Sequence, residues 1–236
     1  MFTTLVISSI GLVVIYFWLK NRKQKQLSFI ENYQFPQAIL DRAKQKHDYL
    51  SDKDMQKVAQ ATKDYFYICN QAKGKMVSMP SEIVDVLWHE FILFTRAYES
   101  FCKKGIGRFL HHVPTEAMTS KTSAQEGIKR AWRLSCAKEN IHPKRPDKLP
   151  LLFVIDKVLE IKGGFNYDLR CKAKPYNSNS GSSCGGYCAT DIGCASGCAG
   201  ESTGSSSESS FFGDGDGGSS CSSCGGSSCG SGCGGD

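Results

Sequence analysis

The stretch Val86-Leu-Trp-His-Glu-Phe-Ile-Leu-Phe94 is an apolar run interrupted by one histidine and one glutamate. It belongs to a longer segment that begins at Pro80 and ends at Gly105, residue types that favour helix starts and stops. At about 100° per residue, one face of this segment collects mostly apolar side chains. That face comprises Val84, Leu87, Trp88, Phe91, Thr95, Tyr98 and Cys102. The segment therefore predicts one amphipathic helix that contributes its apolar face to a core.

Helical periodicity continues on both sides of this segment, over residues 27–175. Ser51 and Asp54 have the spacing of a capping box at the start of one of the helices. Only residues 165–169 alternate in the way a strand does. The predicted helices cover residues 36–47, 51–74, 80–105, 123–138 and 150–162. The sequence thus predicts an all-α globular domain of about five helices.

Residues 2–19 contain no charged side chain and are followed by four basic residues within 20–25. As a helix they would span roughly 27 Å, close to the hydrocarbon core of about 30 Å. No basic residue precedes them and no small-residue cleavage site follows, which favours a retained transmembrane anchor over a cleaved signal peptide or a buried core helix. We therefore predict a single-pass anchor over residues 1–26. Because Lys and Arg accumulate on the cytoplasmic side, the N-terminus is expected outside and the body in the cytoplasm.

The charges of the chain are divided unevenly. All 29 Lys and Arg precede residue 175, together with 17 of the 23 Asp and Glu, which gives the body a net charge of +12. A basic body suits an anionic lipid surface, although the basic flank can equally serve only to set the topology. No aromatic platform or nucleic-acid motif accompanies the basic residues, which argues against nucleic acid as a partner. A membrane and a protein remain the expected partner classes, and the oligomeric state stays open.

His89 is the first candidate for chemistry. Leu93 stands where a zinc protease motif would have its second histidine, so that motif is absent. On a helical wheel His89 lies away from the apolar face and shares its side of the helix with Asp85. Asp85 could accept a hydrogen bond from one ring nitrogen and leave the other free, as carboxylates do behind metal-binding histidines. The alternative is an exposed histidine paired with its own helix.

His111 and His112 form a second histidine site in the sequence. Together with His89 they could bind zinc, because neutral imidazole is a standard zinc ligand. The alternative is a capping and packing role in a turn that ends at Pro114. Cys102 with either histidine could also form a nucleophile pair, but it belongs to the apolar face, and no orienting group or oxyanion hole is evident.

The order Asp85-Val-Leu-Trp-His89, then Tyr98 and Cys102, then a glycine and histidines, resembles the signature of the glycine-rich domain-containing proteins best known from plants. The resemblance covers roughly residues 80–115. It implies that Asp85, Trp88, His89, Tyr98 and Cys102 are family positions. It also implies an appended glycine-rich segment, which this chain has, and it brings no established catalytic activity. Phe91 stands where that signature has a second histidine.

Residues 176–236 form a low-complexity tail with 17 Gly, 18 Ser and 8 Cys. With almost no aliphatic side chains, the tail is predicted to be disordered unless it is cross-linked. Its cysteines are paired at metal-ligand spacing. The pairs are Cys184 and Cys188, Cys194 and Cys198, Cys221 and Cys224, and Cys229 and Cys233. In a reducing cytoplasm they favour metal binding, in an oxidising space they favour disulfides, and a tail without any ligand is the third alternative.

These observations predict a membrane-anchored, non-enzymatic interaction or metal-handling protein with a thiol-rich flexible tail. Zinc is the candidate cofactor. The alternative is a membrane-bound, metal-dependent hydrolase centred on His89, His111 and His112.

Overall fold

The computed structural model describes residues 2–112, 121–169, 187–189 and 192. Within them the chain is all-α, as predicted, apart from one short parallel pair of strands. The α-helices are α1 (Phe2–Glu31), α2 (Gln37–Lys46), α3 (Asp52–Gln71), α4 (Glu82–Leu93), α5 (Thr95–Phe101), α6 (Lys121–Lys138) and α7 (Leu151–Val158). A π-helix, η1 (Cys102–Ile106), follows α5, and the strands are β1 (Tyr167–Asp168) and β2 (Tyr187–Cys188).

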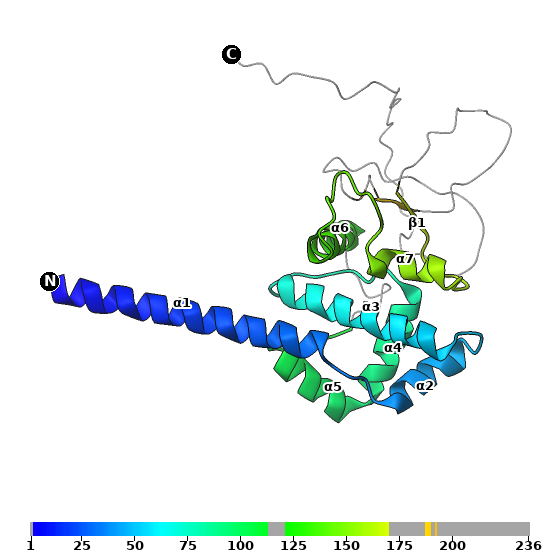
Figure 1. The fold of residues 1–236 in the computed structure, drawn as a ribbon, viewed down its shortest axis with the longest axis horizontal. Helices are drawn as coiled ribbons and strands as arrows, with labels where there is room; N and C mark the ends of the chain where they lie inside the picture. The colour runs from blue at the N-terminus through cyan, green and yellow to red at the C-terminus, as the bar shows by residue number, and fades with distance from the viewer. Residues whose placement is uncertain (1, 113–120, 170–186, 190–191, 193–236) are drawn as a thin grey trace, which may run out of the picture.

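Helix α3 is the centre of the fold and contacts α1, α4, α6 and α7 (Figure 1). The predicted capping box at its start is confirmed: the Ser51 side chain accepts a hydrogen bond from the Asp54 backbone, and the Asp54 carboxylate accepts one from the Ser51 backbone. This cap satisfies N–H groups that have no partner inside the helix. A well-defined start fixes which face of α3 is turned toward the core.

The predicted inward face of α4 is confirmed by its packing. Phe91 is fully buried. The rings of Phe35, Phe66, Tyr98 and Phe101 lie between 5.2 and 6.2 Å from the Phe91 ring, measured between centroids. Aromatic contacts from α3, from α5 and from the segment before α2 therefore meet on this one residue and anchor the C-terminal half of α4 in the core.

The single helix predicted over residues 80–105 is wrong, because the chain turns sharply at Phe94 (φ −85°, ψ 61°). A straight helix would carry Phe101 about 15 Å along the axis from Phe91, yet their rings lie 5.3 Å apart. The break allows α5 to fold back and bury its aromatic residues against α4. The following π-helix ends at Gly107, whose positive φ of 80° suits glycine.

Helix α1 is longer than predicted and crosses the expected boundary at residue 26 without a break. Its C-terminal part belongs to the core, where Ile30 is fully buried. Its N-terminal part extends away from the other helices (Figure 1). The large apolar side chains between residues 7 and 19 are exposed, with Ile7 at 69% and Leu19 at 52%. None of the helices in the described part of the chain combines the length and the apolar character needed to cross a membrane.

Most of the cysteine-rich tail lies outside the described residues. This applies to the predicted ligands Cys184, Cys194, Cys198, Cys221, Cys224, Cys229 and Cys233. Cys188 is described: it is buried in β2 and disulfide-bonded. A disulfide sulfur is not a thiolate ligand, and metal binding by the tail cysteines stays a prediction.

Candidate metal centre

Helix α4 places Asp85 and His89 one turn apart on the same side, because residues four apart share a helix face. Nδ1 of His89 lies 2.9 Å from the backbone carbonyl oxygen of Asp85 and 3.2 Å from its carboxylate Oδ2. A carbonyl oxygen only accepts hydrogen bonds, so Nδ1 carries the proton and Nε2 keeps its lone pair. The predicted contact between the two residues is therefore present, and it fixes the tautomer of His89.

His112 reaches the same carboxylate from the loop that follows η1. Its Nε2 lies 3.1 Å from Oδ1 of Asp85. The centroid of its ring lies 4.1 Å from that of His89 and 4.7 Å from that of Trp88, against which it packs edge-on. Two histidines from separate segments thus converge on one carboxylate. One potential ligand atom from each of the three residues lies within 4.8 Å of the other two.

A hydrogen-bonded relay holds the loop that carries His112. Nε1 of Trp88 donates to the hydroxyl of Tyr98 at 3.1 Å, and this hydroxyl donates to the carbonyl of Leu110 at 2.5 Å. Burial raises the pKa of Tyr98, which keeps the hydroxyl a neutral donor. Cys102, also buried, has its pKa raised by burial despite a hydrogen bond with the Leu110 backbone. A buried, protonated thiol is not an activated nucleophile.

The electrostatics of the centre favour a bound cation. Burial acts to raise the pKa of Asp85, but hydrogen bonds from His112 and His89 outweigh burial and lower it. The hydrogen bond with Asp85 in turn raises the pKa of His89. One turn earlier on α4, burial and the nearby carboxylates Asp85 and Asp156 raise the pKa of Glu82. Asp85 is therefore ionised at neutral pH, in a site that is partly open to water.

The sequence-predicted residues separate into two groups. His89 and His112 are brought together, whereas His111 is exposed and packs against Phe109, with ring centroids 4.8 Å apart. The relay from Trp88 through Tyr98 to Leu110 was not predicted. Its only signal in the sequence is a pair of polar aromatic residues on an otherwise apolar face, each of which needs a partner when it is buried.

A second carboxylate contacts α4 at its N-terminus and was missed from the sequence. Asp156 of α7 is 3% exposed. It accepts hydrogen bonds from the Ser81 hydroxyl at 2.6 Å and from the backbone N–H groups of Glu82, Phe165 and Ile83 at 2.7, 2.9 and 3.3 Å. These contacts tie α7 and the segment after it to the start of α4, and so fix the helix that carries the centre.

The UCP032817-like family matches residues 25–192, more than two thirds of the chain. No curated protein and no solved structure matches the sequence of this chain. The family match corrects the resemblance to the glycine-rich domain-containing proteins. That resemblance depended on a few positions within residues 80–115, and the structure explains them as one helix turn and a buried relay. The match covers every residue of the candidate metal centre and begins inside α1, and the chain therefore belongs to the UCP032817-like family.

Proposed function

We propose that this protein is a membrane-associated, non-enzymatic metal-handling protein in which Asp85, His89 and His112 bind a divalent metal ion. The observation that carries the proposal is the convergence of two imidazoles on one ionised carboxylate. Imidazole nitrogen with carboxylate oxygen suits a borderline cation, and zinc is the leading candidate.

The distances in the centre support direct binding. Two ligands of a tetrahedral zinc ion lie about 3.3 Å apart, since each is about 2.1 Å from the metal. The imidazole nitrogens of His89 and His112 lie 3.2 and 3.1 Å from the oxygens of Asp85. A metal ion can therefore take the place of the two N–H protons with small shifts of the side chains. A neutral histidine would then carry its proton on the other ring nitrogen, and only a protonated histidine would release a proton to solvent on binding.

Three protein ligands leave a coordination position for water or for a group from another molecule. The side chain of His89 is 47% exposed, so this position would face solvent, while the side chain of His112 is 17% exposed. This asymmetry supports metal handling, because one side of the ion would be accessible for exchange and the other held by the fold.

The experiment uses the full chain in detergent micelles under reducing, metal-free conditions, titrated with Co²⁺ and then with Zn²⁺. Cobalt bound by nitrogen and oxygen lacks the thiolate charge-transfer absorption that the tail cysteines would produce. We expect one such nitrogen and oxygen site, with affinity reduced at least about tenfold by Asp85→Asn, His89→Gln or His112→Gln.

The matched control is His111→Gln, which changes the neighbouring, exposed histidine and should leave metal affinity unaltered. If His111→Gln weakens binding as much as His112→Gln, or if all variants bind like the wild type, the centre is not the metal site.

A second candidate function is metal-dependent hydrolysis, favoured by the open coordination position and by Glu82, whose pKa burial raises. A carboxylate with a raised pKa is suited to general acid or base catalysis. Such a hydrolase would use His89, His112 and Asp85, without the exposed His111. We would assay the zinc-loaded chain on ester and phosphate-ester substrates. Turnover that Glu82→Gln abolishes while zinc stays bound would establish this activity.

Membrane association is supported by the apolar surface of α1. The ten large apolar or aromatic residues between residues 7 and 19 are each more than half exposed. A contiguous apolar surface of this kind marks an interaction site, and we assign lipid to it because basic residues follow directly. Val13→Asp with Phe17→Asp should move the protein from the membrane fraction to the soluble fraction. A wild-type chain that is found only in a soluble complex would instead show that a protein covers this segment.

The topology, with the N-terminus outside and the body in the cytoplasm, stays a prediction. A reporter that is active only in the cytoplasm, fused after residue 236, tests it and also decides the redox surroundings of the tail cysteines.

A further inference from the structure

A hollow of about 420 Å³ lies between the middle of α1 and the π-helix η1. Four of its lining residues are cationic and two are aromatic. They are Arg22, Lys25, Lys103, Lys104, Trp18 and Phe29. The residues come from two segments that are far apart in the sequence, so the hollow exists only in the folded protein.

The positive charges of the hollow have no acidic partner in the described part of the chain. None of the described residues that line it is a carboxylate, and none of the four cations forms an ion pair with a described acidic side chain. The Arg22 guanidinium lies 5.6 Å from the Trp18 ring centroid, and the Lys104 ammonium lies 6.0 Å from that of Phe29. Like charges gathered in this way repel one another unless an anion binds between them.

The fold holds these charges in place through close contacts between α1 and η1. A Cβ atom on Gly105 would lie 2.9 Å from Ile30, so only glycine permits this approach without a shift. The Asn70 amide donates to the Gly105 carbonyl at 2.8 Å and to the Gln26 side chain at 3.2 Å. The Gln26 amide covers Gly107. These contacts fix the backbone of α1 against that of η1, so the fold brings the two segments that carry the exposed cationic side chains together.

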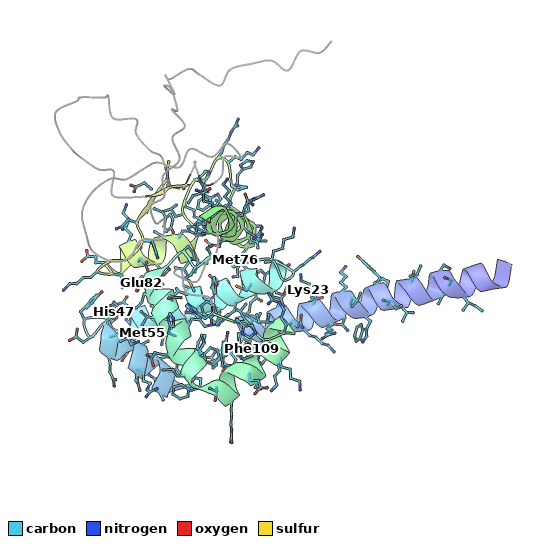
Figure 2. The ribbon with its side chains drawn as sticks, turned by 180° about the vertical axis from the view of Figure 1, so that it is seen from behind. Lys23, His47, Met55, Met76, Glu82 and Phe109 are labelled. Atoms are coloured by element: carbon cyan, nitrogen blue, oxygen red, sulfur yellow. The ribbon has the colours of Figure 1, made fainter. Side chains whose placement is uncertain are left out.

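The hollow is located where the exposed apolar part of α1 ends. Figure 2 shows Lys23, next to Arg22, where α1 leaves the helical body. With the apolar part of α1 in lipid, the hollow would lie at the level of the headgroups. Trp18 would then occupy the interfacial zone in which tryptophan is enriched.

We propose that this hollow binds the phosphate headgroup of an anionic phospholipid. Arg22 and the three lysines supply the positive charge that a phosphodiester needs, while Trp18 and Phe29 cover the adjoining apolar part of the lipid. The inference rests on the lipid association of α1 proposed above and is independent of the metal centre.

The test measures lipid preference. The full chain is diluted from detergent into a mixture of two vesicle populations, one of phosphatidylcholine alone and one that also contains phosphatidylserine. The ratio of protein in the two populations is then determined. We expect the wild type to favour the anionic vesicles, and Lys103→Gln with Lys104→Gln to reduce that preference roughly thirtyfold, at about 1 kcal/mol per basic residue.

The matched control is Lys144→Gln with Lys148→Gln, an equal loss of charge at exposed lysines that do not line the hollow. An equal loss of preference in this control would overturn the proposal, because net charge would then explain the effect. Loss of the preference on addition of inorganic phosphate, or duplex DNA binding that the Lys103 and Lys104 substitutions abolish, would also overturn it.

The two proposals fail in different ways. If α1 does not enter lipid, the wild type binds neither vesicle population. If only the headgroup site is wrong, the Lys103 and Lys104 variant binds both populations in the wild-type ratio.

Discussion

The carboxylate of Asp156, which contacts the start of helix α4, and that of Asp85, which lies on the helix, differ in the donors that surround them. Asp156 at the start of the helix is 3% exposed and accepts hydrogen bonds from a hydroxyl and from backbone N–H groups. Asp85, in the first turn of the helix, has a side chain that is 24% exposed and faces two imidazoles. The first carboxylate is surrounded by donors that cannot titrate, and the second by donors that can.

This difference separates a carboxylate that stabilises the fold from one that can bind a ligand. A backbone amide cannot give up its proton to make room for a metal ion, whereas a neutral imidazole can bind the ion through the ring nitrogen that carries no proton. The same substitution, Asp to Asn, should therefore mainly lower stability at Asp156 and mainly weaken metal binding at Asp85. The predictions that follow test this contrast, beginning with the largest expected effect.

Asp156→Asn should lower the free energy of unfolding by about 3 kcal/mol, since the amide places its own N–H groups against buried donors and leaves them unsatisfied. Denaturant titration measures this loss. The control is Asp168→Asn, whose carboxylate pairs with Lys157 while both side chains are more than half exposed. It should cost no more than about 0.5 kcal/mol. Equal losses in the two variants would remove the structural role assigned to Asp156.

Tyr98→Phe should lower the free energy of unfolding by about 2 kcal/mol, because the indole of Trp88 loses its buried acceptor and the Leu110 carbonyl loses its donor. Zinc affinity should fall about tenfold as well, since the loop carrying His112 is no longer held. Tyr49→Phe, at a position that is 52% exposed, is the control for both measurements. A destabilised Tyr98→Phe protein with unchanged zinc affinity would show that the relay does not position His112.

Asp85→Asn should change the free energy of unfolding of the metal-free protein by less than about 1 kcal/mol, because its pairs are partly exposed. Added zinc should raise the melting temperature of the wild type, since a ligand that binds only the folded state stabilises it. The variant should show little of this rise. A variant that is stabilised by zinc as strongly as the wild type would contradict the role of Asp85 as a ligand.

The smallest expected effect is the pH dependence of the metal-free centre. His89 has a pKa raised mainly by its hydrogen bond with Asp85. Its contribution to stability is thus complete below the unfolded value of about 6.5 and is lost as pH rises through the folded pKa. Burial acts to raise the pKa of Asp85, but hydrogen bonds with its two histidine partners lower it. Its contribution to stability is therefore complete above the unfolded pKa of about 3.9 and is lost as pH falls through the folded pKa.

The pair should therefore stabilise the fold most between about pH 4 and 6.5, by a few tenths of a kcal/mol after solvent screening. The measurement is the difference in unfolding free energy between the wild type and His89→Gln as a function of pH. A difference that grows as pH rises above 7 would have the wrong sign for this pair.

The spacing of residues in the sequence was sufficient to predict contacts that lie within one helix. The capping box of Ser51 and Asp54 and the pairing of Asp85 with His89 depend only on residues three and four apart, and both are present. The break at Phe94 could not be read in this way. Its conformation allows aromatic rings from α4 and α5 to pack together, and this gain depends on the whole core. The same holds for α1, whose C-terminal part is fixed by contacts with η1.

Composition and periodicity by themselves determined that the body is all-α, that the N-terminal segment is apolar with a basic flank, and that His89 lies off the buried face. They could not choose between His111 and His112, because adjacent loop residues differ only in direction. The tertiary structure made that choice: the relay through Tyr98 holds the Leu110 carbonyl and turns His112, not His111, toward Asp85. A site built from one helix and a loop from elsewhere in the chain forms only on folding, since the anchoring of the loop decides which of its side chains contacts the helix.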